Sequence, residues 1–593
     1  MKRPHFTVLI GIALMVFAGL TRWQNLTEEP NIITDGHGYH AYLPAVFIYQ
    51  DLQFSFADSA SAPYYPAEKR AGFIVRSESG NVNKYFVGTA VLQAPFFVIA
   101  CTISWLMGIP VDGYSLPFQL MVGVAALFYL VFGMWFLSRA LLNMGFRQTP
   151  AMAAVVVMLF GTNLLYYTLY EPSMSHVYSF FTVSAFIYYV HAAVVSQRIT
   201  AWIGVAFTLG LTVLIRPTNG LIVLGIPAIA GGLNTLTAIE SLFKHKRILF
   251  LSLLVVMGVV AVQPIIYLIQ TGSAFVWSYK SEGFNFASPE IFNVLFSYRK
   301  GLFVYSPVLL LAVVGMLSAI EARRSRYIWL VLFLSIVTWV ISSWWMWFYG
   351  GCYGQRSFIE YLPFFAIGLA FTFRSGWGVL KPWFFYSIAI LLLVLSLVQT
   401  YQYVQKIIPF DNMNKEKYWN LFLHTGDDLA WYYAGYAGQN SYKGIDSLLI
   451  TYDMEDSRNW NNEKLTNEAS FRGKSASKMS ATDHYGITLQ KPVSELPLQP
   501  NLVRVSGWVR SNSWTTGLAF VCSIEDSTGA GYYWHKYPLR PQFEGINEWS
   551  YVSALFKCGF PRSASDRFII YPLKSDGSTI YFDDMEISFI YAR

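Results

Sequence analysis

A series of long apolar runs in the first 400 residues is the feature that most limits what this chain can fold into. An α-helix needs about 20 apolar residues to cross the hydrocarbon core of a bilayer. About eleven spans are predicted, at residues 6–22, 115–138, 150–169, 177–196, 201–216, 219–236, 248–270, 302–321, 327–348, 358–373 and 383–400. No small-x-small cleavage site follows the first run, so it is predicted to remain as a helix rather than be removed as a signal peptide.

The composition of the chain changes after this apolar part. Charged residues make up only 13% of the 593 residues, about half the share of an ordinary soluble protein. Residues 446–593 instead alternate apolar and polar positions between Gly, Ser, Asn and Pro turns, which is typical of antiparallel strands. We therefore predict an α-helical membrane region at 1–401 with a long outer loop at 23–114, a juxtamembrane segment at 402–445, and an all-β sandwich at 446–593.

Lysine and arginine residues predict which side of the membrane each loop faces, because short cytoplasmic loops are enriched in them. Lys2 and Arg3 precede the first helix. The later loops on the same side hold Arg139, Arg147, Arg198, Lys244, Lys246, Arg247, Arg323, Arg324, Arg326, Arg374 and Lys381. We expect a multi-pass inner (plasma) membrane protein with a cytoplasmic N-terminus and, after an odd number of spans, a periplasmic C-terminal domain. These loops account for the net charge of +7, and no RNA-binding motif or basic stripe predicts a nucleic-acid partner.

Two apolar segments of the long outer loop are predicted to lie along the membrane surface, in contact with its lipids. Residues 86–107 are apolar enough to span, but a span there would place Arg139 and Arg147 outside and invert the charge pattern. Residues 39–52 are predicted to form an amphipathic interfacial helix.

Carboxylate and imidazole groups form two clusters on the predicted outer side, where ionisable residues are seldom placed without a function. Asp35 and His37 follow the first helix in ITDGHGYH, and Glu171 and His176 lie in the short loop YEPSMSH. Asp35 either caps the next helix or serves as a general base or metal ligand. These oxygen and nitrogen groups would suit a divalent metal ion, so a metal at this site is one expectation.

Basic residues on the same side are candidates for holding a phosphate. Arg299 and Lys300 in SYRKGLF break the positive-inside pattern, and Arg356 follows a Gly-rich turn in GGCYGQRSF. A guanidinium group suits phosphate oxygens because it donates paired hydrogen bonds. Lys84 is either a further phosphate ligand or an interfacial anchor. Arg356 is either a phosphate ligand or the partner of Glu360 in an i,i+4 ion pair.

Aromatic residues complete this set. Tyr39, Trp347 and Tyr353 lie in the same outer segments as the charged residues and are candidates for stacking on a sugar ring. Arg216, in LIRPTNG, either lines the same cavity or extends to the interface. Cations for a phosphate, carboxylates for a nucleophile and rings for a sugar are complementary, so their occurrence on one side predicts a site there.

The layout of residues 1–400 resembles the C-type (GT-C) integral-membrane glycosyltransferases, which include protein O-mannosyltransferases and the aminoarabinose transferases of lipid A. The shared features are about eleven spans, interfacial helices, and a long first outer loop with Asp35 just after the first helix. The resemblance implies a polyprenyl-phosphate sugar donor used at the outer face, with Asp35 as catalytic base and Glu171 as a second acidic residue. Many members have two adjacent or near-adjacent acidic residues in the first loop. Here Gly36 follows Asp35 and His37 occupies the next position, which counts against a metal-dependent mechanism.

The expected function is transfer of a sugar from this donor to a lipid, glycan or protein acceptor. Asp35 would take the proton of the acceptor hydroxyl, and Arg356 with Arg299 or Lys84 would stabilise the leaving phosphate. A single displacement would invert the anomeric centre. Two alternatives stay open: a transporter or flippase for a lipid-linked glycan, and a non-catalytic envelope protein that binds glycan or assembles with partners. The chain shows no internal repeat of the kind common in transporters.

The C-terminal region resembles the jelly-roll fold of carbohydrate-binding modules. The segments DMEDSRNW, VSGWVRS and IYFDDMEISF carry this resemblance. It implies that Asp583 and Asp584 lie near a structural calcium ion. Alternatively, these two residues terminate a turn.

Two further features of the C-terminal region leave alternatives open. Trp534, Tyr532 and Tyr533 either stack on sugar rings or fill the core of the sandwich, because alternate residues of a strand face opposite sides. Cys522 and Cys558 either form a disulfide, which an extracytoplasmic compartment permits, or remain buried thiols.

Overall fold

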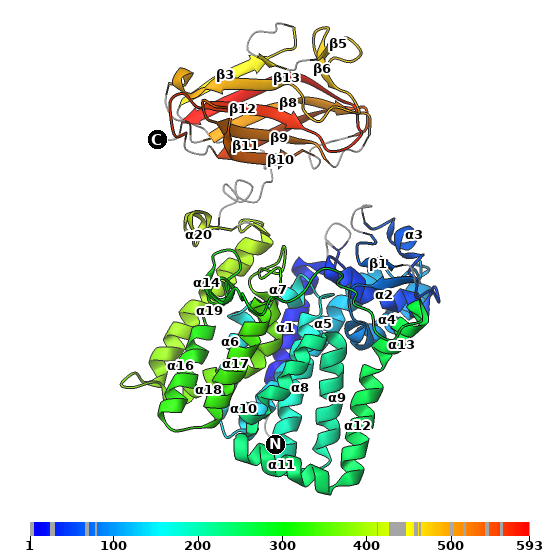
Figure 1. Cartoon of the computed structure of the whole chain (residues 1–593), viewed down its shortest axis with the longest axis vertical. Helices are drawn as coiled ribbons and strands as arrows, with labels where there is room; N and C mark the ends of the chain where they lie inside the picture. Colours follow the sequence, from blue (N-terminus) through cyan, green and yellow to red (C-terminus); the bar gives the residue numbers. More distant parts are fainter. Residues whose placement is uncertain are drawn as a thin grey trace. The chain divides into compact units, whose positions relative to one another are not determined.

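The structure is a computed structural model, and it divides the chain into two compact units (Figure 1). One unit comprises Met1–Thr400 with Asp411–Lys415, and the other comprises Tyr401–Phe410 with Glu416–Arg593. The described residues are 5–593 apart from 24–25, 27–29, 66–69, 78–79, 412, 426–445, 456–459, 462–463, 498–499, 501, 514–516, 540–544, 558–560 and 592–593.

The first unit is built from helices, with one short hairpin of β1 (Ile74–Ser77) and β2 (Gly80–Asn83). Its α-helices, with the two that extend beyond it, are α1 (His5–Thr21), α2 (Asp35–Phe47), α3 (Ala57–Ser61), α4 (Gly88–Met107), α5 (Leu116–Asn143), α6 (Gln148–Phe160), α7 (Leu164–Leu169), α8 (His176–Val190), α9 (Ala201–Ile215), α10 (Ile226–Ala230), α11 (Gly232–Lys244), α12 (Lys246–Val260), α13 (Val262–Thr271), α14 (Ile291–Phe296), α15 (Leu302–Tyr305), α16 (Leu309–Glu321), α17 (Arg326–Ser342), α18 (Leu362–Ser375), α19 (Pro382–Val404) and α20 (Lys415–Leu421). A π-helical turn η3 (His191–Val195) and 3₁₀ helices η4 (Pro217–Gly225) and η5 (Arg356–Tyr361) complete it.

Several of these helices are long and apolar enough to cross a membrane. Within the described residues they are Gly88–Met107, Leu116–Asn143, His176–Val195, Lys246–Thr271 and Pro382–Val404, and a bent pair at Pro217–Ala230 and Gly232–Lys244 makes a sixth if it counts as one span. Shorter apolar helices follow the same pattern at Thr7–Thr21, Gln148–Phe160, Ala201–Ile215, Leu309–Glu321 and Arg326–Ser342. The predicted helical region with several apolar spans is thus confirmed, while the number of about eleven stays a prediction.

The predicted span at 219–236 is wrong in its geometry. The chain there forms a 3₁₀ helix and a short α-helix, and then bends by 115° into α11. The bend falls at Gly231, whose φ of 87° is a conformation that favours glycine. The consecutive glycines Gly231 and Gly232 therefore separate α10 from α11, and neither part is long enough to span the membrane alone.

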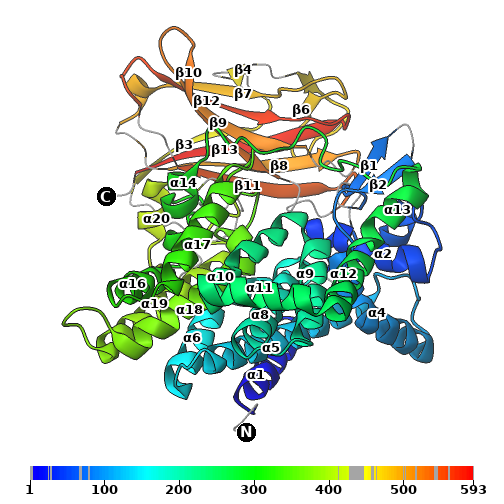
Figure 2. The same ribbon diagram turned by 60° about the horizontal axis from the view of Figure 1, so that its bottom comes forward.

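Helix α2 differs from the predicted amphipathic helix at 39–52. Its residues from Gly36 to Ala45 are all buried, so it has no polar face turned to solvent. Its glycines make this close packing possible, because a Cβ atom on Gly36 would overlap Ser173 and one on Gly38 would overlap the ring of Tyr85. In both views α2 lies beside α4 and α13, and Figure 1 shows α11 at the other end of the helical unit (Figures 1 and 2).

The second unit contains a sandwich of two antiparallel sheets, as the alternation predicts. One sheet has the order β10-β9-β12-β7-β4, and the other has the order β11-β8-β13-β6-β5 with β3 also paired to β13. The strands are β3 (Asp446–Tyr452), β4 (Trp460–Asn461), β5 (Leu465–Thr466), β6 (Ala476–Met479), β7 (Thr488–Pro492), β8 (Leu502–Ser511), β9 (Ala519–Glu525), β10 (Gly531–Pro538), β11 (Trp549–Lys557), β12 (Arg567–Leu573) and β13 (Ile580–Tyr591). Alternate residues such as Phe520, Phe568 and Phe589 fill one core between the sheets.

Cys522 lies in this core as a buried free thiol. Burial raises the pKa of the Cys522 thiol to about 12. The structure thus has a thiol at Cys522 rather than a disulfide, and Cys558 lies outside the described residues.

The Asp583 carboxylate is buried and accepts hydrogen bonds from three backbone N–H groups. The donors are Phe471 (2.6 Å), Arg472 (3.1 Å) and Asp584 (2.8 Å). It thereby ties the loop before β6 to β13, beside a bulge in β13. The predicted calcium ion stays a prediction, because no group of three or more His, Cys, Asp or Glu side chains in the described ranges is arranged to hold a metal.

We expect Asp583→Ala to destabilise the sandwich by about 2 kcal/mol, because it leaves buried N–H donors without an acceptor. The readout in the full-length protein is alkylation of Cys522 against urea concentration, since this thiol reacts only when the core opens. Asp584→Ala is the matched control and should cost less than about 1 kcal/mol, because its partner Arg472 is exposed. Equal urea midpoints for the two variants would contradict this account.

Candidate active site

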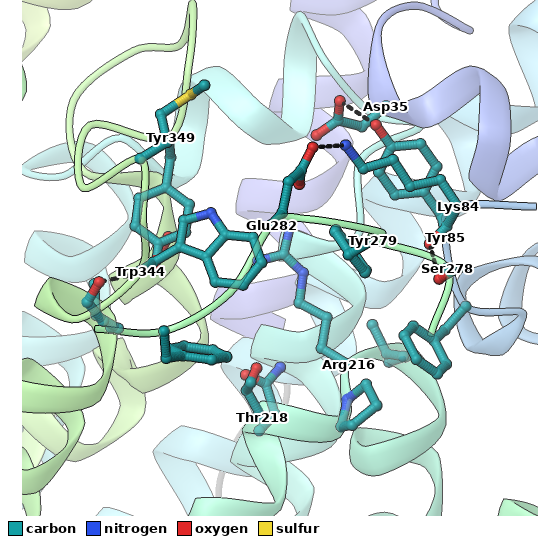
Figure 3. Close-up of a pocket in the computed structure, with 18 of the residues that line it drawn as sticks. Asp35, Lys84, Tyr85, Arg216, Thr218, Ser278, Tyr279, Glu282, Trp344 and Tyr349 are labelled. Atoms are coloured by element: carbon teal, nitrogen blue, oxygen red, sulfur yellow. Dashed lines mark hydrogen bonds and ion pairs between the residues drawn. The ribbon is translucent and has the colours of Figure 1, made fainter. Parts of the chain in front are cut away.

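A cavity of about 340 Å³ lies in the helical unit, within the size range of small-molecule sites. Its walls come from the start of α2, the segment after β2, the start of η4, the loop between α13 and α14, the end of α17 and the start of η5 (Figure 3). Several predicted outer segments that are distant in the sequence therefore meet at one place.

Asp35 is the first residue of α2 and faces this cavity. Its Oδ1 atom accepts a hydrogen bond of 2.7 Å from the Tyr85 hydroxyl, and its Oδ2 atom lies 3.0 Å from Nη2 of Arg356. The alternative that Asp35 caps α2 is wrong, because the capping position is Thr34 and makes no side-chain cap. Burial raises the pKa of the Asp35 carboxyl, but the Arg356 charge and the Tyr85 hydrogen bond outweigh it and hold the pKa below its usual value.

Glu171 is a buried carboxyl in the loop between α7 and α8. It accepts a hydrogen bond of 3.0 Å from the Tyr166 hydroxyl. Burial raises the pKa of Glu171 to about 7, and the charge of Arg356 only partly offsets this effect. Glu171 is not among the residues that line the cavity, yet it interacts electrostatically with both members of the Asp35–Arg356 pair. The two carboxyls thus differ in protonation near neutral pH.

Three cations reach the cavity, and each has a carboxylate partner. Besides Arg356, these are Arg216 and Lys84. Nη1 of Arg216 lies 3.4 Å from Oε1 of Glu360, and its Nη2 donates to the Tyr39 hydroxyl at 3.5 Å. Figure 3 shows Arg216 extending into the middle of the cavity.

Lys84 closes one side of the cavity. Its Nζ atom lies 2.6 Å from Oε1 of Glu282, and its carbonyl oxygen accepts a hydrogen bond of 2.8 Å from the Ser278 hydroxyl (Figure 3). The ammonium group also lies 5.2 Å from the centre of the Tyr279 ring. The loop between α13 and α14 is therefore attached to the segment after β2 through polar contacts.

Glu360 does not pair with Arg356, so the predicted i,i+4 ion pair is wrong. Its Oε1 atom lies 3.0 Å from Nδ1 of His176 and also faces Arg216. This leaves Arg356 bound to Asp35, while its Nε atom is buried and has no hydrogen-bond partner. An unsatisfied buried donor beside a cavity is costly, and a bound anion would satisfy it.

Two predicted phosphate-binding cations lie outside the cavity. Arg299 donates two hydrogen bonds to the Asp411 carboxylate, from Nε at 2.8 Å and from Nη2 at 2.9 Å. Its guanidinium group also stacks on the ring of Phe348. Lys300 is buried and donates to the carbonyl oxygen of Cys352. Arg299 and Lys300 therefore bind groups of the protein and do not line the cavity.

Of the predicted imidazole and aromatic contacts, some line the cavity and others do not. Tyr39 lines the cavity, whereas the His37 ring is buried against Tyr65 and Tyr114. Tyr353 is buried as well, and its carbonyl oxygen accepts a hydrogen bond from Asn163.

Trp347 does not line the cavity. Its carbonyl oxygen accepts a hydrogen bond from the Gln355 side chain at 3.0 Å. The neighbouring rings of Trp344 and Trp345 form part of the wall instead, together with Tyr349. The aromatic wall was thus predicted in the correct segment but at the wrong residue.

The side chains around the cavity do not form a metal-binding set. Asp35 is paired with Arg356, and His176 is paired with Glu360. Throughout the described ranges, no cluster of three or more His, Cys, Asp or Glu side chains could hold a metal ion. A divalent metal ion at this site therefore remains a prediction of the sequence alone.

Comparison with known proteins gives similarities among solved structures. No protein-family model matches the sequence, and a search of curated proteins finds no match. The arabinosyltransferase EmbB from Mycobacterium smegmatis is similar over 97% of this chain and 64% of its own, with 12% identity and a TM-score of 0.38. The oligosaccharyltransferase AglB from Archaeoglobus fulgidus, solved with an inhibitory peptide and a dolichol-phosphate, is similar over 71% of this chain and 60% of its own, with 9% identity and a TM-score of 0.35.

A further similarity covers a smaller part of the chain. The CBM22-1 xylan-binding domain of Xyn10C from Paenibacillus barcinonensis is similar over 26% of this chain and all of its own, with 15% identity and a TM-score of 0.18. This chain spans less than two thirds of the length of the two membrane proteins. At such identities neither an activity nor a site residue can be transferred. Structures similar to this chain thus include membrane glycosyltransferases and a carbohydrate-binding module.

Proposed function

We propose that this chain is a membrane glycosyltransferase that moves a sugar from a polyprenyl-phosphate donor to an extracytoplasmic acceptor, with inversion at the anomeric carbon. The observation that carries the proposal is the cavity in which Asp35 meets Arg356 and Arg216 beside aromatic rings. Sugar transfer from a phosphate needs a base for the acceptor and cations for the leaving group. This cavity offers both within one small volume.

The reaction is a single displacement. The acceptor hydroxyl oxygen attacks the anomeric carbon, and the bond from that carbon to the phosphate oxygen breaks. The proton of the hydroxyl passes to Asp35, and the bonding electrons leave with the polyprenyl phosphate. Arg356 and Arg216 stabilise the charge that grows on the phosphate. One displacement inverts the anomeric centre.

Donor binding and base activation are coupled through Arg356 in this proposal. In the structure Arg356 neutralises Asp35, which makes that carboxylate a weak base. A donor phosphate attracts the same guanidinium group, which has an unused donor at Nε. As Arg356 turns to the phosphate, Asp35 loses its counter-ion and becomes a stronger base. The Tyr85 hydroxyl keeps the carboxylate oriented during this exchange.

The remaining walls suit the lipid and the sugar. Val340 and Ile341 at the end of the apolar helix α17 line one side, next to Trp344 and Trp345. Trp345 is 53% exposed, so this wall continues to the outer surface of the unit. A polyprenyl chain requires such an apolar path, and flat rings provide faces for a sugar. These features support a lipid-linked sugar over a soluble nucleotide sugar.

The proposed orientation puts the cavity on the extracytoplasmic side. Asp35, Arg216 and the start of α8 lie at one end of the helices. The opposite ends of α8, α9 and α12 carry Arg198, Lys244 and Lys246. Basic loops mark the cytoplasmic side. About eleven spans and a periplasmic sandwich are part of this proposal.

We expect Asp35→Asn to lower sugar transfer by about 10²- to 10⁴-fold, the contribution typical of a general base. The assay uses membranes with equal amounts of each variant, a radiolabelled polyprenyl-phosphate hexose and a mixture of envelope acceptors. Asp58→Asn is the matched control, because Asp58 lies in the same outer loop with a side chain that is 70% exposed. Full transfer by Asp35→Asn would refute the assigned base. Wild-type protein that moves the labelled lipid across vesicles without transferring sugar would favour the transporter.

The raised pKa of Glu171 predicts a pH dependence of donor binding. Glu171 loses its proton as the pH rises through about 7, and the new negative charge then competes with the donor phosphate for Arg356. We expect the donor KM to rise by about fivefold between pH 6 and pH 8, equivalent to about 1 kcal/mol. The phosphodiester of the donor keeps its charge over this range.

Glu171→Gln is the test of that assignment. An amide does not titrate, so the KM of this variant should stay flat between the same two pH values. An equal rise of KM in the wild type and in Glu171→Gln would contradict the role given to Glu171.

A second proposal, that the sandwich binds a glycan chain, is favoured by an exposed aromatic surface. Trp534 is 52% exposed, and its Nε1–H group donates to the Tyr571 hydroxyl at 3.1 Å. Tyr485, which is 57% exposed, packs its ring 5.7 Å from that of Tyr571. Phe568 and Ile570 point into the core, so Tyr571 lies on the outer face of its sheet. Three adjoining rings on one face suit the repeated sugar faces of a glycan.

The other two aromatic residues predicted for stacking have different positions. The Tyr532 hydroxyl donates to Asp566, and the Arg562 guanidinium group covers its ring at 4.2 Å. Tyr533 packs against the core of the sandwich. Of the three predicted rings, Trp534 is therefore the one available to a ligand.

We expect Trp534→Ala in the full-length protein to weaken binding to immobilised envelope polysaccharide by about tenfold, because it removes the largest exposed ring. Tyr551→Ala is the control, since Tyr551 is 39% exposed but belongs to the opposite sheet. Equal binding by both variants and the wild type would refute a glycan site on this face.

A further inference from the structure

Helix α11 runs across one end of the helical unit rather than along the bundle (Figures 1 and 2). It follows the 115° bend after α10 and packs against α10, α12 and the π-helical turn η3. Since η3 continues α8 away from His176, α11 lies at the opposite end from the cavity that contains Asp35. This is the end at which the basic loops gather.

The helix has three distinct faces. Thr235, Ala238 and Leu242 are buried against the rest of the unit. A stripe of apolar side chains at i, i+3 and i+7 spacing remains exposed, namely Leu236 (66%), Ile239 (37%) and Phe243 (62%), with Leu233 (82%) beside it. The stripe is adjacent to the buried face, as expected for a helix that rests on one surface while packing against another.

The remaining face of α11 is polar. Thr237, Glu240 and Lys244 follow one another at i, i+3 and i+7, and the last two form an exposed ion pair of 2.7 Å. Apolar and polar stripes of this kind occur on helices that lie in the plane of a membrane interface. A membrane-spanning helix would not need a charged stripe along its length.

The next helix, which packs against α11, also exposes apolar side chains. α12 begins at Lys246 directly after α11, and together with α13 it forms an apolar helix with little of its surface buried in the unit. Phe250, Leu253 and Met257 on α12 are between 48% and 64% exposed. The surface beside the α11 stripe is therefore one that lipid tails cover if α12 crosses the bilayer.

Basic residues border this surface. Lys244 ends α11, and Lys246 and Arg247 begin α12, all three with exposed side chains. Cations at such a junction meet the headgroup phosphates of the bilayer, and anionic lipids attract them most strongly. The basic residues and the exposed apolar stripe thus both indicate that a lipid bilayer covers this surface.

We propose that α11 is an interfacial membrane helix. Its stripe of Leu236, Ile239 and Phe243 inserts among the acyl chains, and the Lys244–Arg247 junction binds the phosphates of anionic lipids on the side of the basic loops. The occupant is the bilayer surface and not a second copy of the chain, because the adjoining helix α12 is exposed and apolar enough to cross a membrane and because cations lie at the junction of the two helices. This inference does not depend on the proposed sugar transfer.

Photocrosslinking of the full-length protein in vesicles tests the proposal. The photoreactive residue p-benzoylphenylalanine replaces Phe243 or Leu236, with Thr237 and Glu240 as matched controls on the polar face. The vesicles contain equal amounts of phosphatidylglycerol and phosphatidylethanolamine. We expect phospholipid adducts from positions 243 and 236 to exceed those from 237 and 240 by at least about fivefold, because only the stripe enters the acyl region.

Three results would overturn the proposal. Adducts that join two protein chains through position 243 would show that a second copy covers the stripe. Equal lipid adducts from 243 and 240 would show a buried or spanning helix. For the headgroup contact, the triple variant K244Q/K246Q/R247Q should lower the share of phosphatidylglycerol among the adducts at position 243 by about twofold or more, and an unchanged share would refute it.

Discussion

The partly buried ion pair between Asp35 and Arg356 is the contact on which the candidate site depends. It joins the start of α2 to η5, the 3₁₀ helix before α18, and these two parts of the chain are distant in sequence. A charge pair removed from water costs free energy unless further hydrogen bonds satisfy it. The Tyr85 hydroxyl satisfies one oxygen of Asp35, but Nε of Arg356 stays without a partner.

The three cations around the cavity follow a common rule. Arg356, Arg216 and Lys84 are each matched by one carboxylate, so the resting site is close to neutral. An anionic substrate must therefore replace protein carboxylates rather than meet free positive charge. Such exchange favours a ligand that contacts all three cations over a small anion that contacts one. The longest of the three contacts is that of Arg216, at 3.4 Å.

The sequence predicts the parts of the fold that depend on local patterns. The long apolar runs and the alternating strands are confirmed because both follow from the period of the hydrophobic residues. The break at Gly231 was missed because a run of apolar residues outweighed two glycines. Arg299 and Lys300 were predicted to bind phosphate because their charge is visible in sequence, but their partners Asp411 and the Cys352 carbonyl are not.

Residues of the cavity that the sequence did not single out are also explained by tertiary contacts. Tyr85 and Glu282 acquire a role only when Asp35 and Lys84 are placed beside them. Trp344 and Trp345 line the cavity, whereas the predicted Trp347 does not. The three residues lie in an irregular segment, where no helical or strand period predicts which side chains face the cavity.

The glycine next to Asp35 has a physical reason in the packing of α2. Gly36 follows Asp35, and a Cβ atom at this position would overlap Ser173. The Ser173 hydroxyl in turn donates to the carbonyl oxygen of Asn31 at 2.8 Å, so it cannot move aside without loss of that contact. A carboxylate at position 36 would push α2 away and separate Asp35 from Arg356. The packing of α2 against Ser173 thus keeps position 36 free of a side chain and holds Asp35 beside Arg356.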